Sequence, residues 1–325
     1  MQKLIFFISS LLVLAILSAC GNEGNVDEDD FSSYPEENIT LIVPWGAGGD
    51  TDIIARTVNK YLEEELDTTI VTQNIGGGGG VIGGQEGLTA DPDGYTLINA
   101  HDSVGIANLM GTSDYDYFDF EPVSLLSTAS EIIVTNADND WDDMTDVIEQ
   151  VESEPESISF GATLGSTSHI IPLGIMEDQN VEFNIVNYDG TAERTQAILG
   201  NHLDLGTTTV PAAKEYIESG DLKLLGIVTD ERSDDLSEVP TLIEQGIDFS
   251  FGTNRGYFFP QDTPQEIVEI VSEALGNIAV NEDFQEEMEN QGVDINYKNH
   301  EEYIEFLQED LERFEELLIN QGIID

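Results

Sequence analysis

The feature that most restricts the fold is a regular alternation of strand-like and helix-like segments from Asn38 onward. Short apolar runs such as 39–43 predict buried strands, and residues 52–66 repeat apolar side chains at helical spacing. Strands separated by helices of about 10 to 15 residues are typical of βαβ units. Further strands are expected at 69–73, 95–99, 132–136, 157–161, 183–187, 203–207 and 222–228, and helices at 82–89, 144–151, 168–176, 192–199, 212–217 and through most of 264–324.

The length of this alternating region predicts more than one core. About 290 residues of such units exceed the usual size of a single domain, so the sequence predicts an α/β fold of two lobes with a cleft between them. In open α/β sheets, ligands bind at the carboxyl ends of strands and against the starts of helices. We therefore expect a binding site in the turns that lead from a strand into a helix.

The first 20 residues resemble an export signal. Lys3 precedes an apolar stretch at 4–17, which is too short to span a bilayer and fits the hydrophobic part of a signal peptide. Small residues directly before Cys20 look like a lipoprotein cleavage site, so we predict a signal peptide at 1–19 and a lipid on Cys20. The alternative is a short anchor helix with an incidental cysteine. Residues 20–35 are acidic and lack periodicity, which predicts a lipid-anchored tether.

Cysteine content and charge exclude several classes of protein. Cys20 is the only cysteine, which excludes a disulfide framework and a cysteine-rich metal site. The formal net charge is −56, from 66 Asp plus Glu against 10 Lys plus Arg, so binding to nucleic acid phosphates is excluded. Apolar residues make up 40% and recur periodically, which predicts a folded chain after residue 36 rather than a disordered one. A folded chain with this net charge needs its surface repulsion screened. Salt at about 1 M provides such screening, because it shortens the Debye length to about 3 Å. We therefore expect a halophilic setting.

The first candidate binding turn is PWGAGGDTD at residues 44–52, between a predicted strand and a predicted helix. Glycines let the backbone approach a ligand, and the free N–H groups of a helix start attract an anion. The alternative is a tight turn in which Asp50, Thr51 or Asp52 only caps the helix, with Trp45 in the core. The candidate ligand-binding residues of this turn are Trp45, Gly46, Ala47, Gly48, Gly49, Thr51 and Asp52.

A second turn of the same type is GATLGSTSH at residues 161–169, in the other half of the chain. It combines glycines, hydroxyl side chains and a predicted helix start. Two such turns facing each other would place hydrogen-bond donors for an anion on both walls of the cleft. The candidate residues of this turn are Thr163, Gly165, Ser166, Thr167, Ser168 and His169.

Other motifs do not indicate a cofactor, a metal or an enzyme. The glycine run at 76–80 lacks the context of a dinucleotide or P-loop fingerprint, and we expect a pliable turn beside the cleft. The four histidines lack metal-site spacing, and the acidic runs lack the spacing of an EF-hand. Ser168 and His169 are adjacent at a helix start and point in different directions, which argues against a hydrolase.

Several segments in the same order resemble the receptors of tripartite tricarboxylate transporters, the TctC or Bug family of extracytoplasmic solute receptors. The resemblance is carried by TLIVPWGAGGDTDIIAR, DPDGYTL, GATLGSTSH, NYDGTAERTQAILGNHLDLG and NRGYFFPQDTP, and it spans most of residues 36–325. The chain departs from the family pattern at Ala162-Thr163, where a serine pair is more usual, and at Asp189, where a basic or small residue is common.

This resemblance implies a periplasmic-binding-protein, or Venus-flytrap, fold with mixed, mainly parallel sheets. We expect lobe 1 to comprise residues 36–130 and 230–325, and lobe 2 residues 131–229. The implied ligand is a small di- or tricarboxylate such as citrate, held by both turns and passed to permease subunits in the membrane. The implied location is extracytoplasmic, on the periplasmic side or outer face of the cytoplasmic membrane. An exported sensor feeding a signalling kinase, or a lipoprotein hydrolase, is the alternative.

Three arginines lie near these motifs. Arg255 is a candidate to bind a ligand carboxylate in bidentate fashion, and the alternative is that it neutralises a neighbouring Asp or Glu. The pair Arg255-Gly256 resembles the tricarboxylate branch of the family. Arg56 and Arg194 are expected to be structural partners of nearby groups.

Overall fold

The computed structural model describes residues 31–232, 236–320 and 322–324. The chain divides into two units, residues 1–34 and 35–325, and the second unit contains the fold described below. The predicted signal peptide and Cys20 lie outside the described residues. The predicted tether is described only from residue 31, where Phe31–Ser33 form a short 3-10 helix, η1. Across the described segments, none of the helices combines the length and apolar character that crossing a bilayer requires.

Half of the second unit is built on sheet A. Its strand β1 (Ile39–Val43) lies parallel to β2 (Ile70–Asn74) and β3 (Thr96–His101). On the other side of β3, the antiparallel strand β9 (Gly252–Pro260) pairs with the long strand β4 (Phe120–Asn136), which also pairs with β10 (Val293–Lys298). The carboxyl ends of the parallel strands therefore lie on one edge of sheet A.

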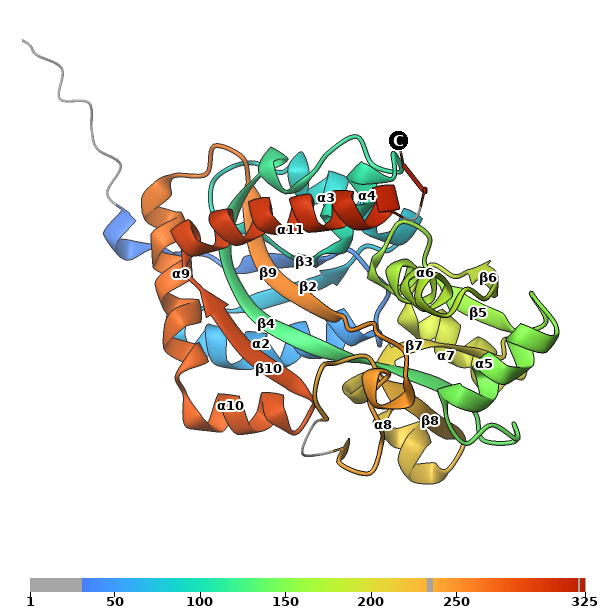
Figure 1. The fold of residues 1–325 in the computed structure, drawn as a ribbon. Helices are drawn as coiled ribbons and strands as arrows, with labels where there is room; N and C mark the ends of the chain where they lie inside the picture. Colours follow the sequence, from blue (N-terminus) through green and yellow to red (C-terminus); the bar gives the residue numbers. More distant parts are fainter. Residues whose placement is uncertain (1–30, 233–235, 321, 325) are drawn as a thin grey trace, which may run out of the picture. The chain divides into compact units, whose positions relative to one another are not determined.

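The other half is built on sheet B, which shares strand β4 with sheet A. Along β4, Ser130 still pairs with Gly252 of β9, whereas Glu131 pairs with Thr209 of β7. Figure 1 shows β4 running from one half of the unit into the other. Sheet B consists of the end of β4 with β5 (Ser159–Ala162), β6 (Asn184–Asn187), β7 (Leu205–Thr209) and β8 (Leu222–Ile227).

The α/β, two-lobed fold expected from the sequence is confirmed, with a larger antiparallel share than expected. Of the nine strand pairings in the described residues, five are antiparallel, namely β3–β9, β4–β9, β4–β10, β4–β7 and β4–β8. The parallel pairings are confined to the outer strands of each sheet. The sheets are thus mixed because two long strands, β4 and β9, pass through the centre of the fold without a helical crossover.

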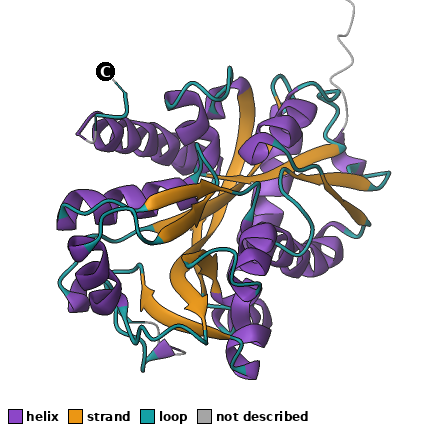
Figure 2. Cartoon of the chain, turned by 90° about the vertical axis from the view of Figure 1, so that its right-hand side faces the viewer, coloured by secondary structure: helices purple, strands orange, loops and turns teal. Residues whose placement is uncertain are grey.

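Helices cover both faces of the sheets, as Figure 2 shows. The predicted helices are present with ends shifted by a few residues. The helices of the second unit are α2 (Asp50–Leu66), α3 (Val81–Leu88), α4 (Ser103–Leu109), α5 (Met144–Ser153), α6 (Thr167–Gln179), α7 (Thr191–Leu199), α8 (Val210–Ser219), α9 (Gln265–Ala279), α10 (Glu282–Glu289) and α11 (His300–Asn320), with short 3-10 turns η2 (Gly78–Gly80), η3 (Tyr117–Asp119) and η5 (Ile243–Gln245).

The last helix, α11, packs against the apolar cores of both halves. Tyr303 and Leu307 belong to the core over sheet A, whereas Phe314 and Leu318, about two to four turns later, belong to the core over sheet B. Each of the last two side chains is 1% exposed or less, and burying one stabilises the fold by about 1.5–3 kcal/mol. The helix thus spans the junction between the two halves together with β4.

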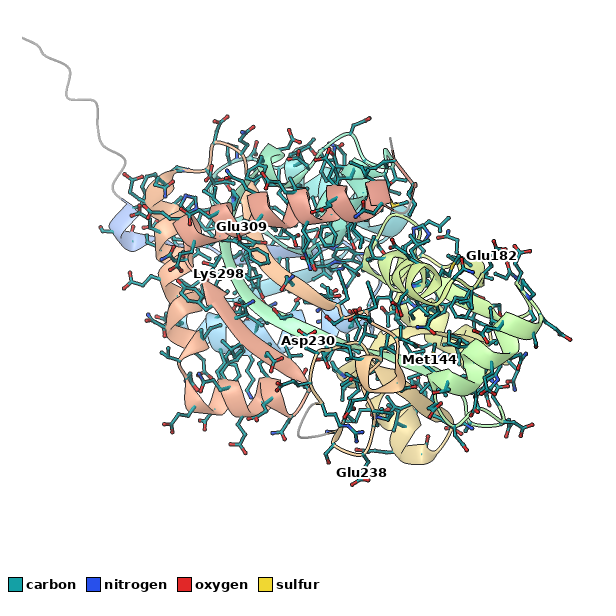
Figure 3. The ribbon with its side chains drawn as sticks, viewed as in Figure 1. Met144, Glu182, Asp230, Glu238, Lys298 and Glu309 are labelled. Carbon is teal, nitrogen blue, oxygen red and sulfur yellow. The ribbon has the colours of Figure 1, made fainter. Side chains whose placement is uncertain are left out.

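The surface carries the acidic excess. Glu182, Glu238 and Glu309, which come from different parts of the fold, are all exposed in Figure 3. Few cations are available to neutralise these groups, so neighbouring carboxylates on the surface repel one another, and salt weakens that repulsion.

Helix α3 packs against the turn that follows β1. Its residue Gly83 lies directly against the backbone of Pro44 and of Ile75. A Cβ at Gly83 would lie 2.3 Å from the carbonyl oxygen of Ile75 and 2.6 Å from Cα of Pro44. We expect Gly83→Ala to destabilise the protein by about 1–3 kcal/mol, since the clash is with backbone. The measurement is the urea midpoint of unfolding. Gly46→Ala is the control, because a Cβ there meets no atom within 4 Å, and an equal loss in both variants would contradict this packing.

Candidate ligand-binding site

Three strand-to-helix turns converge on one cavity of about 250 Å³. They are the turns β1–α2 and β5–α6, which the sequence predicts to be binding turns, and the turn β6–α7. The ends of β3 and the middle of β4 complete the wall. The lining residues are Trp45, Gly46, Gly49, Asp50, Gly76, His101, Glu131, Thr163, Ser166, Thr167, Ser168, Asp189, Gly190, Thr191, Ala192, Glu193 and Arg194.

The predicted site residues divide into two groups by position. Ala47, Gly48, Thr51, Asp52, Gly165, His169 and Arg255 do not line the cavity, whereas Trp45, Gly46, Gly49, Thr163, Ser166, Thr167 and Ser168 do. The structure thus brings the two predicted turns together.

In the first turn, Trp45 forms a wall and Asp52 holds the loop. The Trp45 ring stacks on His101 with 3.8 Å between ring centroids, and its Nε1 donates to the carbonyl oxygen of Gly79. Asp52 accepts hydrogen bonds from the backbone N–H of Gly48 and from the side chains of Arg56 and Asn74. Burial raises the pKa of Asp52, but these hydrogen bonds outweigh it and hold the pKa below its usual value. Asp52 therefore acts as a loop anchor, and Arg56 is its structural partner, as expected.

The glycine run 76–80 packs behind this wall and accounts for the shape of the turn. Gly80 has φ of +105°, and a Cβ on it would lie 2.7 Å from the Trp45 ring. The backbone N–H of Gly79 donates to Asp189 at 3.0 Å, which joins the run to the β6–α7 turn. The run is a turn beside the cavity, as the sequence suggests.

The second turn is closed by its own hydroxyl groups. Ser168 Oγ accepts from the backbone N–H of Thr163 at 2.9 Å and lies 3.0 Å from Ser166 Oγ. The backbone N–H of Thr167, at the start of α6, donates to Ser103 Oγ at the start of α4. The turn thus contacts the sheet A half directly and presents the start of α6 to the cavity.

His169 lies behind this turn, and burial lowers its pKa. Its Nδ1 has no hydrogen-bond partner in the described structure, and no hydrogen bond joins its ring to Ser168. The nucleophile–base pair that a hydrolase requires is therefore not formed by these two residues.

The third turn, Asp189 to Arg194 at the start of α7, is the part of the site that sequence analysis missed. Its signal is the same as in the other turns, a strand followed by a glycine, a hydroxyl residue and a helix, within NYDGTAER. Arg194 is 2% exposed and donates to the carbonyl oxygen of Thr207 at 2.8 Å, with longer contacts to the hydroxyls of Thr163, Ser168 and Thr191 at 3.3–3.4 Å. Every one of these partners is neutral.

A buried charge pair lies at the start of α2. Arg255 of β9 forms an ion pair with Asp50, whose other oxygen accepts from Thr191 Oγ1 at 2.9 Å. Of the two roles considered for Arg255, the structure shows the neutralisation of a neighbouring acid. Burial, the largest single influence, raises the pKa of Asp50, but Arg255, His101, Thr191 and Arg194 together outweigh burial and lower it. Removing one partner of such a buried pair costs about 3–5 kcal/mol.

Two titratable groups beside this pair have strongly shifted pKa values. Burial, together with the charge of Asp50, raises the pKa of Glu131 to about 7, although Thr253, Arg255 and Arg194 oppose the shift. Burial and the charge of Arg255 lower the pKa of His101 to about 3, so this ring is neutral at pH 7. Neither residue stands in a motif, so no sequence pattern indicates a role in the site for either of them.

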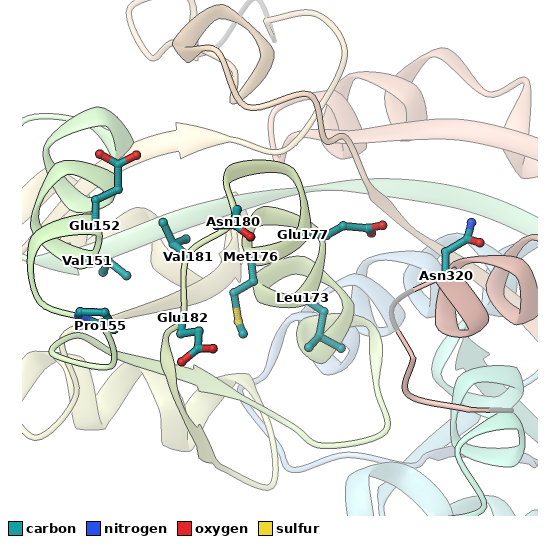
Figure 4. Close-up of a pocket in the computed structure, with 10 residues that line it drawn as sticks. All are labelled: Val151, Glu152, Pro155, Leu173, Met176, Glu177, Asn180, Val181, Glu182 and Asn320. Carbon is teal, nitrogen blue, oxygen red and sulfur yellow. The ribbon is translucent and has the colours of Figure 1, made fainter.

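A larger hollow of about 650 Å³ lies elsewhere, beside α5 and α6, and is shown in Figure 4. It is lined by apolar side chains such as Leu173 and Met176 together with Glu152, Glu177 and Glu182. Of the described residues that line it, none is Lys, Arg or His, so its charged side chains repel an anion. Within the described part of the chain, no group of three or more His, Cys, Asp or Glu residues could hold a metal ion.

The pKa of Glu131 predicts a pH-dependent stability. The folded state binds this proton more tightly than the unfolded state, where the pKa is near 4.5, so stability is lost as pH rises from 4.5 to 7. The free energy of unfolding of Glu131→Gln does not contain this pH-dependent loss. Relative to the wild type, we expect it to be about 2 kcal/mol higher at pH 8 than at pH 5. Urea unfolding at both pH values, at constant ionic strength, measures this gain, and a difference that does not change with pH would contradict it.

Comparison with known proteins agrees with this fold and cavity. The chain is 31% identical to Protein BugT of Bordetella pertussis over 262 residues, which cover 78% of this chain and 80% of BugT. The solved structure of the periplasmic binding protein BugD matches with a TM-score of 0.84 and 28% identity, covering 90% of this chain and 99% of BugD. MatC from Rhodopseudomonas palustris, solved with bound malate, matches with a TM-score of 0.81 and 26% identity, covering 88% of this chain and all of MatC.

The family assignment follows from most of the sequence. Residues 54–323 match the tripartite tricarboxylate transporter family receptors, TctC. This match includes every strand and helix of the second unit that follows β1, apart from the start of α2. The chain belongs to the tripartite tricarboxylate transporter receptor family.

Proposed function

We propose that this protein is an extracytoplasmic receptor that binds a small carboxylate in the cavity and delivers it to membrane subunits of a tripartite transporter. The observation that carries the proposal is the convergence of three helix starts and the buried Arg194 on one cavity. The first N–H groups of a helix lack partners within the helix, and each helix start carries about half a positive charge. This arrangement suits an anion that is held at short range.

Arg194 supplies the strongest single donor for a carboxylate. Its side chain is buried, and the described residues offer it neutral oxygens but no direct ion pair. Burial lowers the pKa of Arg194, Glu131 and Asp50 oppose this shift, and at neutral pH the guanidinium stays charged. A ligand carboxylate would provide the counter-charge, with charge-assisted hydrogen bonds. Arg194 was expected to be only a structural partner, and this proposal gives it a second role.

The relatives support a small carboxylate as the ligand. MatC, which has a similar fold, was solved with malate. Malate and other short di- or tricarboxylates, citrate among them, are accordingly the first ligands to test. The lipid anchor at Cys20 and the association of the protein with the outer face of the membrane remain predictions that belong to this proposal.

Closure of the two halves over the ligand is part of the proposal. Three hydrogen bonds already join elements of sheet A to elements of sheet B around the cavity: Thr191 to Asp50, Gly79 to Asp189, and Thr167 to Ser103. We propose that these contacts open when the ligand enters and close after it binds, with the sheet A half moving against the sheet B half. Strand β4, the chain that enters β9 at Gly252, and helix α11 are the connections that would bend.

A cavity-filling variant tests the proposed function. Gly190 lines the cavity in an extended conformation, and a Cβ on it would meet no atom within 4 Å. We expect Gly190→Leu to fold normally and to bind malate at least about tenfold more weakly than the wild type, because the side chain occupies ligand space. Isothermal titration calorimetry at high salt measures this loss.

The matched control is Glu152→Leu, which changes the hollow of Figure 4 instead of the cavity. The control should bind as the wild type does. Unchanged binding in Gly190→Leu, or a loss in Glu152→Leu, would contradict the location of the site. A failure of the wild type to bind any short mono-, di- or tricarboxylate would contradict the function itself.

A further inference from the structure

Two buried acidic residues lie close together away from the cavity, near the junction of the two halves. Asp102 is the residue directly before α4, and Asp310 lies in the middle of α11. Each is 3% exposed, and neither lines the cavity. Helices α4 and α11 pack closely (Figure 1), since a Cβ at Gly105 would lie 2.6 Å from the side chain of Leu311.

A chain of hydrogen bonds joins this pair to the elements that link the two halves. Tyr117 Oη lies 3.0 Å from the backbone oxygen of Asp102 and 3.1 Å from Oδ2 of Asp310. Oδ2 of Asp102 accepts from the backbone N–H of Asn254 in β9 at 2.8 Å, and Asn254 Oδ1 accepts from Thr128 of β4 at 2.8 Å. The network therefore joins α11, the first part of β9 and β4, which are the connections that would bend during closure.

Arg313 connects the pair to the core of the sheet B half. Its guanidinium donates to Asp310 Oδ1 at 2.7 Å and lies 5.9 Å from the centre of the Phe251 ring and 4.7 Å from that of Phe314. Both rings belong to the core over sheet B, whereas Tyr117 belongs to the core over sheet A. A movement of one half against the other would therefore change the surroundings of Asp310.

The described residues place few charged groups around the two acids. Arg313 is the cation that faces them, and its side chain is 54% exposed. The hydroxyls of Tyr117 and Tyr303 also face them and stay protonated, because burial and the two acids raise the pKa of each tyrosine well above its usual value. On the neighbouring strands, His101 of β3 and Arg255 of β9 act on the start of α2 instead. The two acids therefore share a single, partly hydrated cation among the described residues.

Hydrogen-bond geometry and charge both indicate that the pair retains a proton. Tyr117 Oη has one proton for two neighbouring oxygens, and a proton on Asp310 Oδ2 would supply the second hydrogen bond. Burial and the charge of Asp310 raise the pKa of Asp102, and burial raises the pKa of Asp310, although Arg313 opposes it. Ionising both of two neighbouring buried acids is costly, so the proton belongs to the pair.

We propose that Asp102 and Asp310 form a proton-binding site that controls opening of the two halves: the closed form holds the proton, and loss of the proton favours the open form. In the closed form two carboxylates would be dehydrated and would repel each other, whereas a bend at α11 and at the start of β9 admits water to them. Proton binding and closure are then linked, and each shifts the other by the same free energy. This inference rests on the closure included in the proposed function and adds regulation by pH to it.

Small-angle X-ray scattering of the ligand-free, full-length protein tests the site without a ligand. At constant high salt, the radius of gyration of the wild type should increase from pH 6 to pH 9.5, as the pair loses its proton. Asp102→Asn keeps the oxygen that accepts from Asn254 but cannot ionise, so its radius should stay at the pH 6 value. If this variant does not fold, Asp310→Asn is read in the same way. Glu309→Gln, exposed on the same helix, is the control and should behave as the wild type does.

Malate titrations at the same two pH values connect the site to binding. The wild type should bind malate at least about threefold more weakly at pH 9.5 than at pH 6, and Asp102→Asn should lose most of this ratio. A wild-type radius that does not change with pH, or the same change in Asp102→Asn, would overturn the inference. A change in stability without a change in radius or in the affinity ratio would also overturn it. Failure of malate and other short carboxylates to bind at either pH would contradict the proposed function, while the scattering would still decide the inference.

Discussion

The ion pair between Asp50 and Arg255 is the interaction on which the site depends. It joins the start of α2 to the strand β9, and through Thr191 it reaches the start of α7 in the other half of the fold. Because Arg255 is 1% exposed, the pair is not weakened by water or salt as a surface pair would be. It places a fixed negative charge in the cavity, and this charge raises the pKa of Glu131 and helps to keep Arg194 protonated.

The acidic surface and the cavity act on an anion at different distances. A chain with a net charge of −56 repels anions at long range, and salt shortens the range of that repulsion. Capture must therefore come from contacts inside the cavity, where helix starts and Arg194 act on a desolvated group. The larger hollow beside α5 and α6 has the volume for a ligand, but its charged lining groups among the described residues are all acidic, so it does not suit an anion.

Local periodicity was enough to predict the strands of the βαβ units and the helices that connect them. The strand 39–43, the helices after it and the two glycine-hydroxyl turns all appear where local spacing places them. The first part of β4 and the strand β9 were missed, since they contain polar and proline residues and are defined by antiparallel partners far along the chain. Glu131 and His101 were missed for the same reason, because their burial beside Asp50 comes from tertiary packing and not from any local pattern.

The most direct test of the account is a crystal structure of the protein grown with malate. The account predicts one ligand carboxylate within hydrogen-bonding distance of the Arg194 guanidinium and of backbone N–H groups at the starts of α6 and α7, with the Asp50–Arg255 pair intact. A carboxylate bound in the hollow of Figure 4, or one in the cavity that pairs with Arg255 after displacing Asp50, would contradict it.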